Sequence, residues 1–324
     1  MNVLLWHVHG SWTTAFVHGS HRYLVPAVPG RGPDGRGRAD TYVWPDSAVE
    51  VTPADVADAE VDVVILQRPH ELSHLAREWL GGREPGRDLP AVYVEHNAPQ
   101  GEVNAMRHVA ADRRDLLVVH VTHFNDLFWD CGTTPTTVVE HGIVDPGDRY
   151  TGELARAVAV VNEAPRRARV TGTDVLRRIG ARVPVDLFGM DAARLGGEEL
   201  VQERLHGEMA RRRVYVHPNR WTSLGLSRLE AMHLGMPVVA VAATEVVEAV
   251  PPGAGVVSTD VARLETAIRA FLHDPAAACE AGRAARAAAL ARYGLTRFLV
   301  DWDDVLARAV AEHPVRRRAR VPLV

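Results

Sequence analysis

The sequence predicts an α/β protein made of two doubly wound, Rossmann-like domains. Short apolar runs bounded by turn residues recur along the chain, and longer segments with helical periodicity lie between them. The runs lack strict alternation, as expected for parallel strands that are covered on both faces. A polar, turn-rich passage, DPGDRYTGELAR, begins at Asp145 and divides the runs into two similar sets. Two domains facing each other across a cleft therefore fit better than one large sheet.

The first set of apolar runs predicts the N-terminal domain, residues 1–148. The expected strands are 3–8, 61–66, 91–94, 116–121 and 137–139. Segments 71–80 and 124–131 have helical periodicity and lie between these strands. Strands that alternate with helices in this way are typical of a parallel sheet.

The second set predicts a C-terminal domain, residues 149–312. Its expected strands are 157–161, 185–188, 214–216, 238–241 and 255–257. Helices are expected at 198–209 and 226–234, followed by three C-terminal helices at 261–272, 276–292 and 295–310 that pack back on the domain. The arginine-rich tail, residues 313–324, has no apolar pattern and is expected to be solvated.

Composition excludes several classes of protein. The net charge of -4 gives no basic field for nucleic acid, and no apolar run is long enough to span a membrane. We therefore expect a cytoplasmic, bacterial protein with no integral membrane association, and the sequence leaves the choice between monomer and homodimer open. Cys131 and Cys279 match no metal spacing, and neither a metal nor a cofactor is expected. The chain contains no lysine, which excludes a Schiff-base lysine and a P-loop lysine.

The segment from His217 to Val241, HPNRWTSLGLSRLEAMHLGMPVVAV, is the richest in chemistry. A small-residue turn ends at Gly225, and a helix is expected to begin near Leu226. The start of such a helix presents free N–H groups and a positive dipole end to an anion. Glu230 lies one turn into the helix, on the same face as Ser227, where a carboxylate can accept hydrogen bonds from a ribose diol. The alternative is that Glu230 only complements the helix dipole.

This segment resembles the signature of the retaining glycosyltransferases of family 4 and their GT-B relatives, E-G-F-G-L followed by L-E-A-M, G and P-V-V. The matching residues here are Thr222, Ser223, Leu224, Gly225 and Leu226, then Leu229, Glu230, Ala231 and Met232, then Gly235, Pro237, Val238 and Val239. Further similarity lies in Glu140–Asp145, Val160–Asn162 and Glu245–Val247. The resemblance implies a GT-B fold, a donor site on residues 222–227 and Glu230, and a metal-independent transfer that retains anomeric configuration.

The sequence departs from the family pattern at three places. Thr222 replaces the first glutamate of the E-x7-E pair, so that only Glu230 remains. The family's arginine and lysine for the donor diphosphate have no literal match, and we assign that role to Arg167 and Arg169 in the loop from Asn162. The glycine-rich loop after the first strand is reduced to a single glycine.

For the acceptor, the expected residues lie in the first domain. The resemblance assigns catalytic roles to Glu230 and to His96, which follows an expected strand. Glu95 and Asn97 are its expected orienting or acceptor-binding neighbours. Gly10, Ser11 and Trp12 after the first strand are added as acceptor-binding residues, Trp12 as a stacking surface. Ordinary core packing of Trp12 is the alternative.

The sequence thus predicts a glycosyltransferase whose partners are a UDP-, GDP- or ADP-sugar and a small-molecule or glycan acceptor. Thr222 and the missing glycine loop leave a second interpretation open, a glycosyltransferase-like protein that binds without catalysis. A third, a nucleotide-sugar epimerase, needs more acid and base carboxylates than the sequence places.

Overall fold

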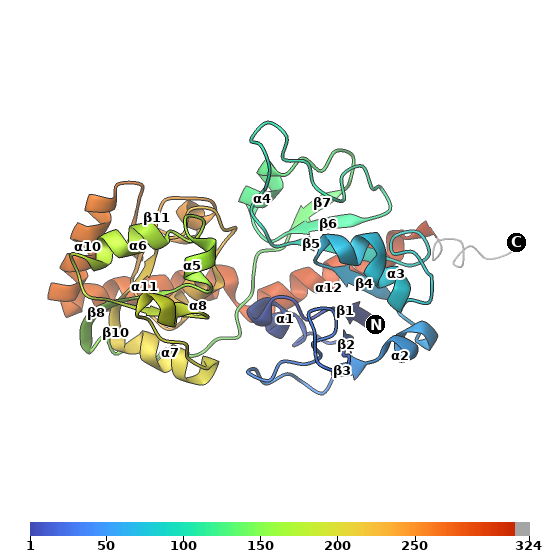
Figure 1. Cartoon of the computed structure of the whole chain (residues 1–324), viewed down its shortest axis with the longest axis horizontal. Coiled ribbons are helices and arrows are strands. Elements are labelled where there is room, and N and C mark those ends of the chain that lie inside the picture. Colours follow the sequence, from blue (N-terminus) through green and yellow to red (C-terminus); the bar gives the residue numbers. More distant parts are fainter. Residues whose placement is uncertain (315–324) are drawn as a thin grey trace, which may run out of the picture. The chain divides into compact units, whose positions relative to one another are not determined.

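The computed structural model describes residues 1–314 and divides the chain into two compact units (Figure 1). Unit 1 comprises Met1–Gly142 and the chain from Leu295 onward, and unit 2 comprises Ile143–Gly294. Each unit is a parallel sheet with helices on both faces, so the predicted pair of Rossmann-like domains of the GT-B fold is confirmed. Within the described residues, no helix combines the length and the apolar character needed to cross a bilayer.

The sheet of unit 1 has seven strands in the order β3-β2-β1-β4-β5-β6-β7. The strands are β1 (Asn2–Leu5), β2 (Arg22–Pro26), β3 (Ala48–Val51), β4 (Val63–Leu66), β5 (Ala91–Glu95), β6 (Leu117–His120) and β7 (Thr136–Val138). The helices are α1 (Gly10–Phe16), α2 (Pro53–Asp58), the π-helical turn η1 (Glu71–Leu75) continued by α3 (Ala76–Trp79), α4 (His123–Phe128) and α12 (Leu295–Glu312). In this order the connections reverse direction between β1 and β4, which is where ligands bind in such sheets.

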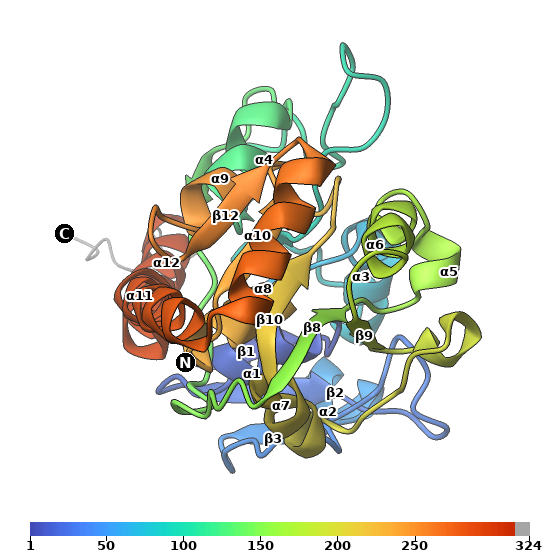
Figure 2. The same ribbon diagram turned by 90° about the vertical axis from the view of Figure 1, so that its left-hand side faces the viewer.

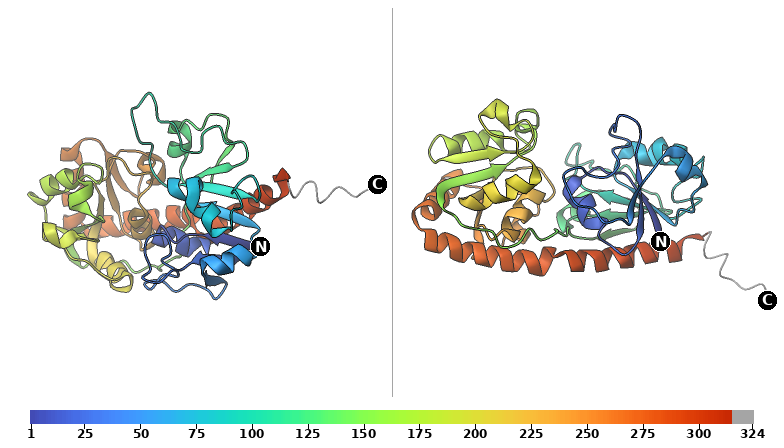
Figure 3. Two further views of the ribbon diagram at one scale, coloured as in Figure 1. Left: turned by 45° about the vertical axis from the view of Figure 1, so that its right-hand side comes forward. Right: turned by 90° about the horizontal axis from the view of Figure 1, so that it is seen from below.

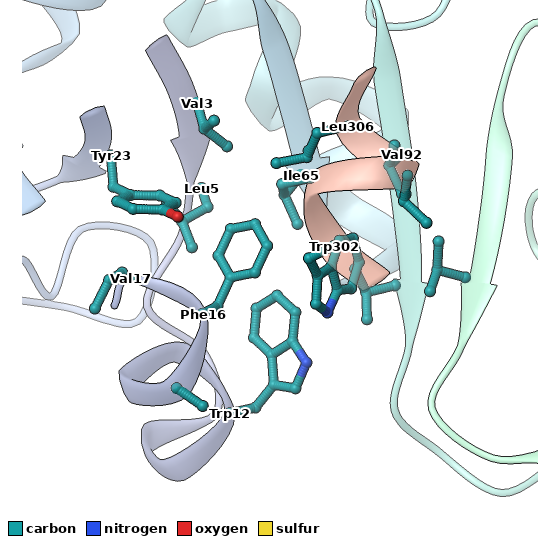
Figure 4. Packing of buried hydrophobic residues seen from close by; sticks show 14 of the residues in the cluster. Val3, Leu5, Trp12, Phe16, Val17, Tyr23, Ile65, Val92, Trp302 and Leu306 are labelled. Atoms are coloured by element: carbon teal, nitrogen blue, oxygen red, sulfur yellow. The ribbon is translucent and has the colours of Figure 1, made fainter. Parts of the chain in front are cut away.

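Alternate residues of the strands build two cores, one on each face of this sheet. From β1, Val3 and Leu5 pack with α1 and α12, whereas Leu4 packs with α2 and α3. Figure 4 shows the first core, where the Trp12 ring stacks on Phe16 with centroids 4.9 Å apart. Burial on both faces explains why these strands read as continuous apolar runs in the sequence.

Helix α12 belongs to unit 1, whereas the sequence analysis assigned residues 295–312 to the second domain and placed the first boundary at residue 148. Figure 3 shows α12 running along the sheet of unit 1. Phe298, Trp302 and Leu306 form a stripe along one side of the helix and are buried in the first core. The Trp302 ring meets that of Trp12 edge-on at 5.6 Å. This aromatic packing returns the end of the chain to the first unit.

The predicted strands of both units are present, and β2 and β3 are additional strands that the sequence analysis did not identify. Residues 315–324 of the predicted tail lie outside the described residues. His313, the first residue assigned to that tail, is buried, with Nε2 3.0 Å from the carbonyl oxygen of Gly86.

The sheet of unit 2 has five strands in the order β12-β11-β10-β8-β9. The strands are β8 (Leu154–Val160), β9 (Val185–Phe188), β10 (Arg212–His217), β11 (Val238–Val241) and β12 (Gly255–Ser258). The helices are α5 (Ala164–Arg167), α6 (Thr173–Gly180), the 3-10 turn η2 (Ala192–Leu195), α7 (Gln202–Arg211), α8 (Leu226–His233), α9 (Val246–Ala249), α10 (Val261–His273) and α11 (Pro275–Tyr293). Here the connections reverse between β8 and β10.

Helices again cover both faces of the sheet (Figure 2), with one hydrophobic core beneath each set. Helices α6 and α10 cover one face, where Ala157 and Ala159 of β8 point. Helices α7, α8 and α11 cover the other, which receives Val158 of β8 and Tyr215 of β10. Helix α8 therefore starts beside the carboxyl end of β10, next to the point where the connections reverse.

Candidate functional site

In unit 2 the turn before α8 depends on a glycine. Gly225 adopts φ of +80°, a region that L side chains rarely occupy, and a Cβ there would overlap the ring of His217. No side chain caps the helix, so its first N–H groups are presented to solvent or to a ligand. This is the anion-binding geometry predicted from the sequence.

Glu230 lies in the second turn of α8 and is 6% exposed. Its Oε2 is 3.4 Å from Nε2 of His206 on α7, and the same ring nitrogen lies 2.9 Å from the side-chain nitrogen of Gln202. Ser227, on the same side of the helix, is hydrogen bonded to the hydroxyl of Tyr215 at 2.8 Å. The carboxylate thus lies against the neighbouring helix α7, at the position predicted for ribose recognition.

Thr222, which replaces the first motif glutamate, is tied into the loop. Its Oγ1 accepts a hydrogen bond from the side chain of Asn219 at 3.2 Å. Its carbonyl oxygen accepts another from the hydroxyl of Thr244 at 2.7 Å. The next two residues, Ser223 and Leu224, are buried. Position 222 therefore offers a neutral hydroxyl where the family pattern has a charge.

Arg167 and Arg169, the two residues predicted to bind the diphosphate, lie in different surroundings in the loop that follows β8. Arg169 is exposed and paired with Asp174 at 3.2 Å, and Arg166 is paired with Glu163. Arg167 is half-buried and has no ion-pair or hydrogen-bond partner for its guanidinium among residues 1–314. Burial, followed by the charge of Arg166, lowers the pKa of Arg167. An unpaired guanidinium of this kind favours an anion, so Arg167 is the stronger candidate of the two.

In unit 1 three histidines from distant segments gather beside the strand where the connections reverse. The ring centroid of His96 lies 4.1 Å from that of His9 and 6.2 Å from that of His141. Burial lowers the pKa of His96 well below its ordinary value, and the neighbouring histidines add to the effect. His96 is therefore a neutral imidazole near pH 7.

The tautomer of His96 follows from Gln67. The Gln67 amide nitrogen donates to the carbonyl oxygen of Trp6 at 2.8 Å, which orients its Oε1 toward Nε2 of His96, 3.0 Å away. Nε2 must then carry the proton, and the neutral ring presents Nδ1 as a hydrogen-bond acceptor.

Glu95 and Asn97, the predicted neighbours of His96, are hydrogen bonded to each other. The Glu95 carboxylate is buried and accepts hydrogen bonds from the backbone N–H of Asn97 at 2.6 Å, from its side chain, and from His108 at 3.0 Å. It contacts His108 on one side of the sheet, whereas His96, the first residue after β5, contacts Trp12 on the other. Asn97 itself is exposed. The structure thus places Glu95 as a group that orders the turn after His96.

The three acceptor-binding residues predicted after β1 differ in their burial and contacts. Trp12 is fully buried in the core, which removes it as a stacking surface for an acceptor and corrects that expectation. Its ring meets His96 edge-on at 5.0 Å and so supports the histidine. Gly10 begins α1, and the Ser11 hydroxyl lies 3.1 Å from that of Tyr42. Both remain at the same end of the sheet as His96.

Sequence reasoning missed several residues that the fold brings to these two sites. Gln67, His9 and His141 surround His96, while His206 and Arg228 accompany Glu230 on α7 and α8. His141 stands in a segment already noted for family resemblance, which was the one signal present in the sequence. Among the described residues, no group of three or more histidines, cysteines or acidic residues is arranged to hold a metal ion.

Comparison with known proteins gives a family match that begins at the first residue of unit 2. Residues 143–274 match the model of a family described as glycosyl transferases group 1. No curated protein matches the chain. The chain superposes on sucrose-phosphate synthase from Thermosynechococcus elongatus with a TM-score of 0.71 and 14% identity, covering 96% of this chain and 99% of that one. For Anabaena HepE in complex with UDP-glucose the TM-score is 0.69 at 16% identity, with 95% and 100% covered.

A glycosyltransferase from Rickettsia africae gives a TM-score of 0.66 at 11% identity, with 96% and 99% covered. At these identities the likeness shows a common fold. Unit 2 thus carries the sequence pattern of glycosyl transferases group 1, in a chain whose fold is that of these three proteins.

Proposed function

We propose that this protein is a glycosyltransferase that moves a sugar from a nucleotide-diphosphate donor to an acceptor hydroxyl. The observation that carries the proposal is the buried carboxylate of Glu230, one turn beyond an uncapped, glycine-led helix start. It lies within the segment that matches glycosyl transferases group 1. A carboxylate beside exposed N–H groups suits a ribose followed by a diphosphate.

In this proposal unit 2 binds the donor. Glu230 accepts hydrogen bonds from the ribose hydroxyls, and the backbone N–H groups of residues 225–227 bind the diphosphate together with Arg167. Stabilisation of the leaving diphosphate by an arginine and a helix dipole makes a metal ion unnecessary. We propose retention of anomeric configuration on the resemblance to the family 4 enzymes. Since the Anabaena HepE structures hold UDP and UDP-glucose, a UDP-sugar is the first donor to test.

Unit 1 serves the acceptor in this proposal. The neutral His96, with Nε2–H bound to Gln67, is the group that contacts and orients the acceptor hydroxyl in this proposal. His9 and His141 shape the surroundings of the ring. Gly10 and Ser11, at the same end of the sheet, contribute to acceptor binding.

The competing function is that of a binding protein without transferase activity. Thr222 favours it, because a neutral hydroxyl held by Asn219 replaces a motif carboxylate. Loss of one hydrogen bond to a charged group costs about 1.5–3 kcal/mol. Such a loss lowers a rate by roughly one to two orders of magnitude, which is small beside the rate enhancements of enzymes. Transfer is therefore the function we favour.

The test is calorimetric titration with UDP, GDP and ADP, without metal, of the wild type and of Glu230→Ala, Arg167→Ala and Arg166→Ala. We expect one nucleotide to bind, with its Kd raised at least about tenfold in the first two variants. Arg166→Ala is the matched control, because its guanidinium is already paired with Glu163 on the surface. Unchanged affinity in Glu230→Ala would contradict the placement of the ribose.

A second assay separates the two functions. The wild type is incubated with the sugar conjugate of the nucleotide that binds, and released nucleoside diphosphate is measured with and without candidate acceptors. Release supports the transferase. Tight binding with neither transfer nor hydrolysis would leave the binding protein as the function.

A further inference from the structure

Behind the turn that starts α8 lies a guanidinium that is completely buried. Arg228 is 0% exposed, and its Nη2 donates a hydrogen bond to the carbonyl oxygen of Leu224 at 2.9 Å. Its Nε and Nη1 are buried with no hydrogen-bond partner in the part of the chain that the structure describes. Nor does Arg228 form an ion pair with a carboxylate there, unlike Arg286 and Arg292, which pair with Asp145 and Glu245.

An unpaired buried charge is destabilising, and the surroundings of Arg228 show this. Burial lowers the pKa of Arg228. Tyr293, Tyr215 and Glu245 oppose this shift only in part, and the charge of Arg292 adds to it. Proteins rarely retain a buried cation without a counter-charge, because removing it from water costs more than hydrogen bonds alone return. The arrangement points to an anionic ligand as the partner of this charge.

A second buried group beside Arg228 points the same way. His217 is 1% exposed, and neither of its ring nitrogens has a hydrogen-bond partner among residues 1–314. Burial and then the charge of Arg228 lower the pKa of His217 to about 3, so the ring is neutral. It packs against Gly225, at the start of α8. Three N–H bearing groups thus lack partners here, and such a surplus of donors favours an anionic ligand over a cation.

We propose that Arg228 supplies the buried positive charge that holds the donor diphosphate at the start of α8, supported by His217. This inference rests on the proposed function and names a further donor-binding determinant. It accounts for how a chain without lysine, and with most arginines of the 163–169 loop paired, can neutralise a diphosphate. A charge in a buried, low-dielectric position acts more strongly on a nearby anion than an exposed one.

The hydrogen bond to Leu224 gives the charge a geometric effect as well. It turns the carbonyl group of Leu224 toward the guanidinium, so that this carbonyl is not presented to the incoming anion. The N–H groups of the following residues, at the helix start, then define the anion-binding side of the turn. Arg228 is therefore a positioning residue that also contributes its charge.

The experiment compares Arg228→Met and Arg228→Lys with the wild type, using inorganic pyrophosphate as the probe in calorimetric titration and thermal unfolding as a second readout. Met keeps much of the volume without the charge, and replacing an unpaired buried ion by an apolar residue is commonly neutral or stabilising. We expect Arg228→Met to weaken pyrophosphate binding at least about tenfold, with a Tm equal to or above that of the wild type. A purely structural arginine would lower Tm and leave affinity unchanged.

Two further variants serve as controls. Arg228→Lys retains a group that can be protonated, so it should bind pyrophosphate more tightly than Arg228→Met, and the difference should grow as pH falls from 8 to 6; equal affinity of the two variants at pH 6 would overturn the role of the charge. Arg213→Met removes a half-buried arginine at the opposite end of β10, bonded to Gly152, and should not change pyrophosphate affinity.

The outcome also separates this inference from the proposed function. If the wild type binds pyrophosphate through Arg228 but binds no nucleoside diphosphate, the inference stands and the transferase proposal fails. If the wild type does not bind pyrophosphate, or Arg228→Met binds it equally well, the inference is wrong.

Discussion

Glu95 and His96 are adjacent in the sequence but serve different faces of the same sheet. His96 packs against Trp12 on one side of β5, and Glu95 bonds His108 on the other. His108 accepts a hydrogen bond at Nδ1 from the backbone of Ala110, so its Nε2 carries the proton that it donates to Glu95. The Glu95 carboxylate thereby links Asn97 and His108, the two ends of the loop that follows His96.

This network predicts that Glu95→Gln is destabilising although it conserves shape. The amide has one acceptor oxygen, whereas the carboxylate uses one oxygen for Asn97 and the other for His108. One donor must then face the amide N–H2, at a cost of about 1–3 kcal/mol in the free energy of unfolding. Urea unfolding measures the change. Glu102→Gln, exposed on the same loop, should stay within about 0.5 kcal/mol; equal effects in both variants would contradict the network.

At the scale of elements, α11 and the end of α8 meet through two glycines. Gly235 ends α8 with φ of +87°, and a Cβ on Gly282 of α11 would overlap the carbonyl oxygen of Gly235. Backbone atoms therefore touch where the two helices are closest. This contact sets the position of α8, and with it that of Glu230.

The contact predicts opposite effects for the same substitution in two helices. Gly282→Ala forces α11 away from α8 and should destabilise unit 2 by about 1–3 kcal/mol. Gly207→Ala, inside α7 with no atom within 4 Å of the added carbon, should stabilise it by about 0.5–1 kcal/mol. Thermal or urea unfolding of the two variants is the measurement. Stabilisation by both would show that the helices can separate without cost.

At the scale of the whole molecule, buried neutral histidines set the response to acid. Burial lowers the pKa of His120 to about 4 and that of His217 to about 3. It also lowers the pKa of His96 well below the ordinary value for histidine. Between pH of about 6.5 and 4 these side chains bind protons in the unfolded chain and remain neutral in the folded one. The unfolded state binds more protons, so stability rises with pH in this window and is lost on acidification.

A substitution isolates one contribution. Each such histidine should cost about 2 kcal/mol between pH 7 and pH 5, and His120→Gln should remove that share of the decrease in unit 1. Urea unfolding at pH 7, 6 and 5 gives the slopes for the wild type and the variant. His74→Gln, at an exposed position, is the control. Equal slopes for the wild type and His120→Gln would mean that His120 is not held neutral by the fold.

The sequence by itself determined the fold class and the position of the glycine turn and helix start in unit 2. Buried parallel strands leave continuous apolar runs, so most strands could be located, and residues 222–230 form a contiguous motif whose turn and helix are local structures. The edge strand β3 was missed because its pattern, AVEV, is only half buried and carries a weaker apolar signal. Strand β2, RYLVP, has only five residues and ends in a proline.

Only the tertiary structure decided the partners of those residues. The histidine cluster joins positions 9, 96 and 141, which are far apart in the sequence. Helix α12 belongs to unit 1 because Trp302 packs against Trp12, another pair that is distant in the sequence. Glu95 and His96 contact opposite sides of the sheet, and within residues 1–314 Arg228 is buried with no carboxylate partner. Periodicity in a sequence reports which face of an element is apolar, whereas the identity of the surface that covers it depends on long-range packing that one sequence does not reveal.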